Sequence, residues 1–407
     1  MNPDNSNLNG FSPSQGFSPS QGFSSSQGFL PPQASAFSYS SYIARCAQLA
    51  MLLEVSASPK PGNVDREHDY PGTCFEHFVA SSVGVYPAFE VAARSRNGIG
   101  SLIKKAVYES AAWQRGGNTH FGAFLLLIPL AMAAGKIFES NNFENKSPEC
   151  KNPESKNVEN KNPESKNSGK KVSGNVNIEK DFSQENLRLD SSDFELLISQ
   201  AHTFVRETNS EDAVEFYRAF GAAGVRVNSV EEFDLEDPKA TAELREQNIT
   251  LYDLMEISKG YDLLANEWTS GFKRCLEGAD FILSFMRFPN GEENNFNKVT
   301  HTGYAGCFGG NINEAVIYAF MKLLSRYRDT FVQTKFDLKT ADYVSSRAFE
   351  ILSLLESSGP KNRDFSSLIP VIREFDLELL DKKINPGSTA DLVIAGLFIA
   401  LLGGLRF

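Results

Sequence analysis

Apolar residues three and four positions apart recur along most of this chain. That spacing places apolar side chains on one face of an α-helix. It predicts helices over residues 42–55, 78–93, 99–113, 194–205, 213–220, 251–283, 312–327 and 341–355. Alternating strand-like runs bounded by turns are hard to find. The pattern therefore predicts an all-α fold.

Two further segments, 121–134 and 392–405, are apolar on every face. Both are shorter than the roughly twenty residues that a membrane-spanning helix needs. We therefore expect two buried core helices and no association with a membrane. Each segment follows a polar, glycine-containing motif whose side chains can cap a helix N-terminus, and such a terminus binds phosphate readily.

Two low-complexity segments are expected to lie outside the helical domain. Gly-Phe-Ser-Pro-Ser-Gln recurs from Gly10 with a period of six, which predicts a disordered tail over residues 1–36. The tail has no basic region followed by a continuous apolar stretch, so it does not resemble a signal peptide. Asn-Pro-Glu-Ser-Lys-Asn occurs at 152–157 and 162–167. It indicates a disordered insertion at about 140–188 in a single helical catalytic domain, residues 37–407.

Charge and cysteine usage exclude several classes of protein. The net charge is −11 and the basic residues are dispersed, whereas a nucleic-acid-binding surface needs a concentrated basic stripe. The five cysteines form no C-x-x-C pair, which indicates reduced thiols and a cytoplasmic location. The five histidines show no H-E-x-x-H pattern, so no zinc site is predicted.

The segment from Ser56 to Asp69 concentrates groups that suit an anionic ligand. Prolines stiffen the turn on both sides of Lys60, and Gly62 lets the backbone approach a ligand. Acidic and imidazole groups follow within ten residues. A second polar segment, Gly116-Gly-Asn-Thr-His-Phe-Gly122, precedes the first apolar run. Taken singly, each motif also has a structural explanation, as a helix cap, a core histidine or a solvated acidic pair.

These two segments resemble the triphosphoribosyl-dephospho-CoA synthase family. The resemblance continues in the same order through later blocks: Leu251-Tyr-Asp-Leu-Met255 with Asp262 and Glu267, then Asp329-Thr330 and Lys335, then Asn385-Pro-Gly-Ser-Thr-Ala-Asp391. It covers roughly residues 41–136 and 190–407.

The resemblance implies a transferase for which ATP is a substrate. ATP would give up adenine, and its triphosphoribosyl group would move to the 2′-hydroxyl of 3′-dephospho-CoA, making a prosthetic-group precursor. Glycosyl transfer of this kind passes through an oxocarbenium-like transition state. The site then needs negative charge near C1, a base for the acceptor hydroxyl and a proton source for adenine. Mg²⁺ is expected, because an acidic chain must neutralise the triphosphate.

Site roles follow from the matching positions. The predicted catalytic residues are Asp65, His68, Asp69, His120, Asp262 and Glu267. The predicted substrate-binding residues are Lys60, Gly62, Asn63, Asn118, Thr119, Lys335, Asn385, Ser388 and Asp391. Asp65 and Asp69 are also the predicted Mg²⁺ ligands.

The chain departs from the family pattern in two places. Thr334-Lys335-Phe336-Asp337 stands where relatives tend to have Arg-Lys-His-Gly, and Gly117 and Ala123 replace expected threonines. These changes leave the ATP half of the site intact and put the acceptor half in question. Two alternatives follow: a related ATP-dependent ribosyl transferase with a different acceptor, or a non-catalytic nucleotide-binding protein.

Overall fold

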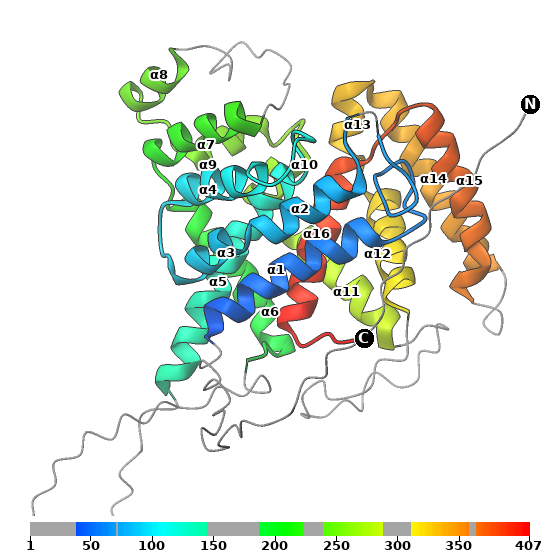
Figure 1. Cartoon of the computed structure of the whole chain (residues 1–407), viewed down its shortest axis with the longest axis horizontal. Helices are drawn as coiled ribbons and strands as arrows, with labels where there is room; N and C mark the ends of the chain where they lie inside the picture. The colour runs from blue at the N-terminus through cyan, green and yellow to red at the C-terminus, as the bar shows by residue number, and fades with distance from the viewer. Residues whose placement is uncertain (1–37, 71, 145–186, 224–238, 288–310, 358–363) are drawn as a thin grey trace, which may run out of the picture. The chain divides into compact units, whose positions relative to one another are not determined.

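The computed structural model describes residues 38–70, 72–144, 187–223, 239–287, 311–357 and 364–407 (Figure 1). In these ranges the regular elements are helices, and a single β-bridge joins Tyr70 to Thr73. The all-α prediction is confirmed. The predicted tail and the repeats at 152–157 and 162–167 lie outside the described residues.

The helices follow one another along the chain without strands between them in the described ranges. They are α1 (Tyr39–Ser56), α2 (Phe75–Gly84), α3 (Tyr86–Arg94), α4 (Ile99–Ala111), α5 (Phe121–Glu144), α6 (Ser191–Arg206), α7 (Ser210–Ala223), α8 (Ala240–Glu246), α9 (Leu251–Ser258), α10 (Leu263–Ser270), α11 (Lys273–Arg287), α12 (Ile312–Arg326), α13 (Thr330–Lys335), α14 (Leu338–Ser357), the short 3-10 helix η3 (Phe365–Leu368), α15 (Ile369–Asp381) and α16 (Gly387–Leu402).

The two wholly apolar helices, α5 and α16, lie in the core. α16 packs against α1, α5, α11 and α12, and in Figure 1 it passes behind α1. Its crossing with α11 is close, because a Cβ added at Gly396 would lie 2.7 Å from the carbonyl carbon of Gly278. Only glycine at this crossing allows the two backbones to approach so closely.

Helix α5 is longer than the apolar segment predicted it to be. Its stretch Phe121–Asn141 is long and apolar enough to cross a membrane, so the length argument does not hold for it. In the structure, 89% of the most apolar window is buried inside the protein, as in a core helix. Burial therefore supports the core position that length alone had suggested.

The predicted single helix over residues 251–283 is wrong. The structure has three helices there, α9, α10 and α11, although the apolar spacing runs through all of them. Asp262 caps the start of α10, and Gly271 ends it with a φ of +83°. Side-chain capping and a left-handed glycine break a helix locally without disturbing the apolar period.

The segment between α1 and α2 is fastened to the C-terminal part of the chain. Gly62 has a φ of +70°, and a Cβ there would lie 2.2 Å from the carbonyl oxygen of Ile384. The Tyr70 hydroxyl donates to the carbonyl oxygens of Gly62 at 2.6 Å and of Ile384 at 3.2 Å. Gly62 is therefore required by a close contact with the protein's own backbone, just before α16 begins.

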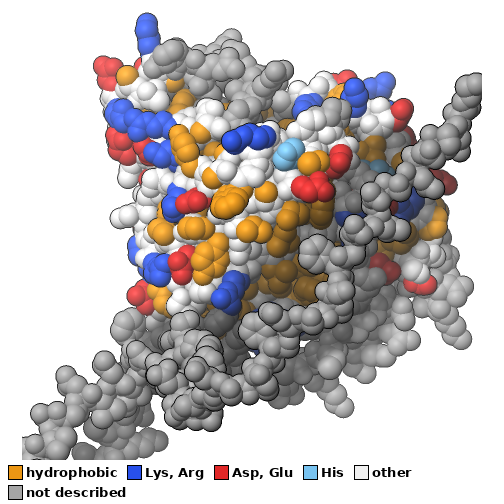
Figure 2. Space-filling view, viewed as in Figure 1, with side chains coloured by type: hydrophobic (Ala, Val, Ile, Leu, Met, Phe, Trp, Pro, Cys, Tyr) orange, Lys and Arg blue, Asp and Glu red, His pale blue; other side chains and the backbone are white. Residues whose placement is uncertain are grey.

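The face formed by α1–α4 carries exposed apolar side chains between charged ones (Figure 2). Large apolar side chains exposed in these helices are those of Leu49, Val83, Val91 and Tyr108, and Trp113, just after α4, is 75% exposed.

Candidate active site

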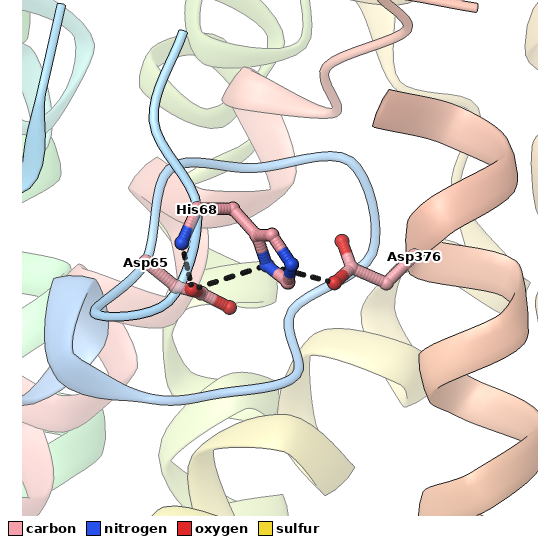
Figure 3. A group of neighbouring side chains, drawn as sticks. All are labelled: Asp65, His68 and Asp376. Atoms are coloured by element: carbon pink, nitrogen blue, oxygen red, sulfur yellow. Dashed lines mark hydrogen bonds and ion pairs between the residues drawn. The ribbon is translucent and has the colours of Figure 1, made fainter. Parts of the chain in front are cut away.

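Three ionisable side chains from two distant segments meet beside the 57–70 loop (Figure 3). His68 Nδ1 lies 3.5 Å from Asp65 Oδ1 and 3.3 Å from Asp376 Oδ2. Both carboxylates are buried, whereas the imidazole is partly exposed. One ligand atom from each residue lies within 4.8 Å of the others, so the three could share a metal ion. We call this group the loop triad.

Asp65 organises the turn that carries His68. Its Oδ1 accepts hydrogen bonds from the backbone N–H groups of Glu67 at 2.7 Å and His68 at 3.0 Å. Its Oδ2 accepts from the N–H of Lys60 at 3.3 Å. A buried carboxylate that accepts these hydrogen bonds fixes the conformation of the loop.

Asp376 reaches the triad from α15. Its Oδ1 accepts a 2.9 Å hydrogen bond from the N–H of Gly62. Its Oδ2 is buried and accepts no hydrogen bond from the described residues, although it faces His68. Burial raises the pKa of Asp376 to about 6, against the hydrogen bond from Gly62 and the positive charge of His68. This oxygen is thus available to a proton or a cation.

The Lys60 side chain points from the loop into the protein interior. Its Nζ lies 2.6 Å from Glu54 Oε1 and donates to the carbonyl oxygen of Glu54 at 3.0 Å. Neither residue is appreciably exposed. Burial raises the pKa of Glu54, and the Lys60 charge opposes that rise. The placement therefore gives Lys60 a structural partner and does not favour the predicted direct contact with triphosphate.

His120 occupies the buried start of α5. Its Nδ1 lies 2.8 Å from Ser81 Oγ, which lies 2.7 Å from Ser110 Oγ. Burial and the charge of Lys60 lower the pKa of His120 to about 3, so the ring is neutral at pH 7. Its Nε2 is buried with no hydrogen-bond partner among the described atoms. That nitrogen can serve a ligand.

A cavity of about 200 Å³ opens beside this histidine. It is lined in part by Asn118, Thr119, Phe121 and Phe124. Asn118 Oδ1 accepts from the N–H of Phe121 at 3.0 Å, so this side chain caps α5. Thr119 Oγ1 lies 3.5 Å from Ser110 Oγ. The predicted motif thus combines a helix cap with the wall of a cavity.

Carboxylates gather at the start of α16. Asp391 packs over Gly122, where an added Cβ would lie 2.0 Å from its Oδ2. Burial raises the pKa of Asp391 well above its usual range, and the charges of Glu54, Asp329 and Asp262 add to the rise. The same residues concentrate negative potential at the junction of α5 and α16. We call this junction the α16 cluster.

Asp329 ties α13 to α16. Its Oδ2 accepts from the N–H of Thr389 at 2.7 Å and from the Thr389 hydroxyl at 2.8 Å. Burial raises the pKa of Asp329 to about 6, against these hydrogen bonds. The neighbouring Ser388 Oγ lies 3.3 Å from Thr330 Oγ1. Ser388 is therefore held at the helix start, where it was predicted to act.

The two carboxylates predicted on one long helix have different surroundings. Asp262 Oδ1 accepts from the N–H groups of Leu264 and Ala265, both at 2.8 Å, and burial raises its pKa. Glu267 is buried, and its oxygens accept from the N–H groups of Arg274 and Cys275 and from the Arg274 guanidinium at 2.8 Å. Glu267 therefore caps the start of α11, and its catalytic role stays a prediction.

The remaining predicted residues have contacts outside the two groups named above. Asp69 is exposed, and its Oδ1 accepts from the N–H of Phe75 at 2.9 Å, so it borders α2 and the loop triad contains Asp376 in its place. Lys335 is exposed, with Nζ 4.3 Å from the centre of the Phe331 ring. Asn63 Nδ2 donates to the carbonyl oxygen of Pro386 at 3.5 Å. Asn385 Oδ1 is buried with no hydrogen-bond partner in the described ranges.

The family model for ATP:dephospho-CoA triphosphoribosyl transferase matches residues 40–406. The chain belongs to that family. A crystal structure of a candidate triphosphoribosyl-dephospho-CoA synthase from Archaeoglobus fulgidus is similar in fold. Its TM-score is 0.50 at 25% sequence identity, over 82% of this chain and 100% of that one. A comparison with curated proteins finds no match.

Family membership confirms the predicted activity. The protein is a transferase of the triphosphoribosyl group from ATP to dephospho-CoA. The sequence analysis did not predict two buried carboxylates, Glu54, which pairs with Lys60, and Asp376, which belongs to the loop triad. A carboxylate within the apolar run of residues 50–55 was a signal for Glu54. No motif marks Asp376, a single acidic residue on an amphipathic helix.

Proposed function

We propose that the loop triad and the α16 cluster together form the centre at which the triphosphoribosyl group is transferred. We also propose that the enzyme acts in the cytoplasm. The observation that carries the proposal is their convergence. The 57–70 loop, the start of α5 and the start of α16 are far apart in sequence, and each brings ionisable groups to neighbouring positions.

The reaction breaks the bond between C1 of the ATP ribose and the adenine nitrogen and forms a bond from C1 to the acceptor 2′-oxygen. Adenine leaves with the electron pair and takes up a proton, while the acceptor hydroxyl loses one. The carboxyl groups of the α16 cluster would stabilise the positive charge that develops at C1, because that charge favours the ionised form of Asp391. The neutral His120, through Nε2, would hydrogen-bond the departing base in the adjoining cavity.

The loop triad fits a divalent cation. Two buried carboxylates and an imidazole lie within ligand distance of one another, and Asp376 Oδ2 has no hydrogen-bond donor among the described residues. Mg²⁺ prefers oxygen ligands, so Asp65 and Asp376 would hold it, and His68 at the exposed edge would give way or carry a proton. When bound, the ion neutralises triphosphate charge.

The proposal is tested by incubating the purified protein with ATP, Mg²⁺ and 3′-dephospho-CoA and following free adenine by chromatography. Adenine should appear in equal amount with a product heavier than the acceptor by one triphosphoribosyl group. Asp376→Asn should reduce this rate by about a hundredfold or more. Asp381→Asn, an exposed change on the same helix, is the matched control and should leave it unchanged.

Two other results would redirect the assignment. ATP binding without adenine release would indicate a nucleotide-binding protein. Adenine release that requires an acceptor other than 3′-dephospho-CoA would indicate a related ribosyl transferase. Equal rates for Asp376→Asn and Asp381→Asn would remove the loop triad from the centre.

A further inference from the structure

A second hollow, of about 820 Å³, lies between α14 and the segment from α9 to α13. Its cationic lining residues are Lys259, Arg274, Arg326 and Arg328. We call it the basic cleft. The lining also contains three carboxylates, those of Asp262, Asp342 and Glu350, so the cations outnumber them by one. Even a small local excess of positive charge is notable in a chain whose net charge is −11, because it attracts an anion against the field of the whole protein.

The guanidinium groups in the cleft can accept a new partner. Arg326 pairs with Glu277 and Arg328 with Asp342, and the two arginine side chains are 48% and 56% exposed. Exposed ion pairs of this kind contribute little, since water and salt compete with them. An incoming phosphate can therefore replace or share the carboxylate, with the bidentate geometry that arginine offers.

Arg274 supplies a fixed cation in the lining of the cleft. Glu267 holds its guanidinium at 2.8 Å, and the Tyr327 ring lies 4.7 Å from its Cζ. Its Nε is buried without a hydrogen-bond partner among the described residues. A preorganised cation of this kind orders a ligand with little loss of side-chain freedom.

The cleft reaches the transfer centre. Asp262 and Thr330 belong to its lining. Thr330 Oγ1 accepts from the N–H of Leu263 at 2.9 Å and lies 3.3 Å from Ser388 Oγ at the start of α16. A molecule in the cleft therefore has one end beside the α16 cluster.

We propose that the basic cleft binds the acceptor, 3′-dephospho-CoA, with its diphosphate on Arg326 and Arg328 and its reacting hydroxyl beside Asp262. This assignment rests on the proposed function. Asp262 would take the proton of the hydroxyl as its oxygen bonds to C1. The carboxylate is already oriented, because its other function is to cap α10.

The lining favours the acceptor over the triphosphate of ATP. A nucleotide transferase with two phosphorylated substrates needs two places that attract phosphate, and the loop triad offers a metal-dependent one. The cleft offers cations, and it also contains Phe349, whose side chain is 63% exposed. Cations beside an apolar aromatic surface suit a diphosphate that carries an organic arm.

Binding measured by calorimetry tests this assignment. The double variant Arg326→Gln with Arg328→Gln should bind 3′-dephospho-CoA about tenfold to a hundredfold more weakly, and ATP with Mg²⁺ within about twofold of the unmodified protein. Arg94→Gln is the matched control. It removes a similarly exposed, paired arginine on α3, which contributes nothing to the cleft lining, and should change neither affinity.

Two further variants remove groups whose loss should not prevent folding. Phe349→Ser removes an exposed side chain and should weaken acceptor binding about threefold or more, again without affecting ATP. Asp262→Asn keeps a capping oxygen and should lower kcat by about a hundredfold while acceptor affinity stays within about threefold.

The outcomes separate this proposal from the one on which it rests. Unchanged acceptor affinity in the double variant, with normal adenine release by the unmodified protein, would overturn the cleft assignment alone. Equal weakening of ATP and acceptor would overturn it too, since the cleft would then act as a general charge field. If the unmodified protein does not bind 3′-dephospho-CoA, both proposals fail.

Discussion

The ammonium nitrogen of Lys60 lies 2.6 Å from a carboxylate oxygen of Glu54, and both side chains are buried. Lys60 belongs to the 57–70 loop, and Asp65 fixes the turn of that loop by accepting hydrogen bonds from its backbone N–H groups. A buried pair of this kind can cost as much to desolvate as it gains, but removing one partner leaves an isolated charge. Lys60 therefore has a structural role next to the site.

Replacing Lys60 with methionine should lower the free energy of unfolding by about 3 to 5 kcal/mol, because Glu54 is left buried without its partner. Adding Glu54→Gln should recover part of that loss. Urea denaturation of the two single variants and the double variant measures the coupling. A Lys60→Met protein of normal stability that binds ATP tenfold to a hundredfold more weakly would restore the direct triphosphate contact predicted from the sequence.

Metal affinity should depend on pH through Asp376. Burial raises the pKa of this carboxyl to about 6, so below that pH a proton competes with the cation. Affinity for Mg²⁺ should fall by up to about tenfold per pH unit below 6 and level off above it. Calorimetric titration at several pH values measures this.

The choice of metal ligands is checked by two substitutions. Asp376→Asn should abolish the pH dependence together with most of the affinity. Asp69→Asn should leave both unchanged, since Asp69 borders α2 outside the loop triad. Equal losses in the two variants would support the Asp65–Asp69 pair predicted from the sequence.

The free energy of unfolding should depend on pH through His120. The pKa of His120 is about 3 in the folded protein and 6.5 in the reference state, so below pH 6.5 the unfolded chain binds a proton that the folded chain does not. The free energy of unfolding is therefore at its full value above pH 6.5, and it decreases as the pH falls from 6.5 toward 3. For one proton, the unfolding free energy changes by at most about 1.4 kcal/mol per pH unit.

Unfolding free energies of the unmodified protein and His120→Gln, measured between about pH 4.5 and 7, test this dependence. The variant should show the shallower slope. It should also turn over more slowly at pH 7 if Nε2 serves the departing base. A destabilised variant with full activity would make His120 a core residue only.

Glu267→Gln should affect stability and leave the chemistry intact. The change weakens the cap on α11 and the ion pair with Arg274, at a cost of about 1 to 3 kcal/mol. Thermal unfolding should shift downward by several degrees. The turnover per folded molecule should remain normal, in contrast to Asp262→Asn. A large drop in kcat at unchanged stability would return Glu267 to the catalytic residues.

Most of the helices, including the two core helices, could be predicted because apolar periodicity is a local property. The helices α8, α13 and α15 were not predicted. The position of Asp65 and His68 in one turn was also local, since they are three positions apart and Asp65 accepts a hydrogen bond from the backbone N–H of His68. Family membership followed from motifs that recur in a fixed order. The breaks around α10 were missed, because caps such as Asp262 interrupt a helix without altering its apolar spacing.

The tertiary structure alone decided which groups share a site. Asp376 joins His68 only because α15 packs against the 57–70 loop, and Lys60 is buried only because α1 places Glu54 beneath it. Spacing along a chain specifies a partner one helical turn away, whereas a partner hundreds of residues distant depends on how whole helices pack. Burial then sets the charge state of each group, and burial is a property of the packed molecule.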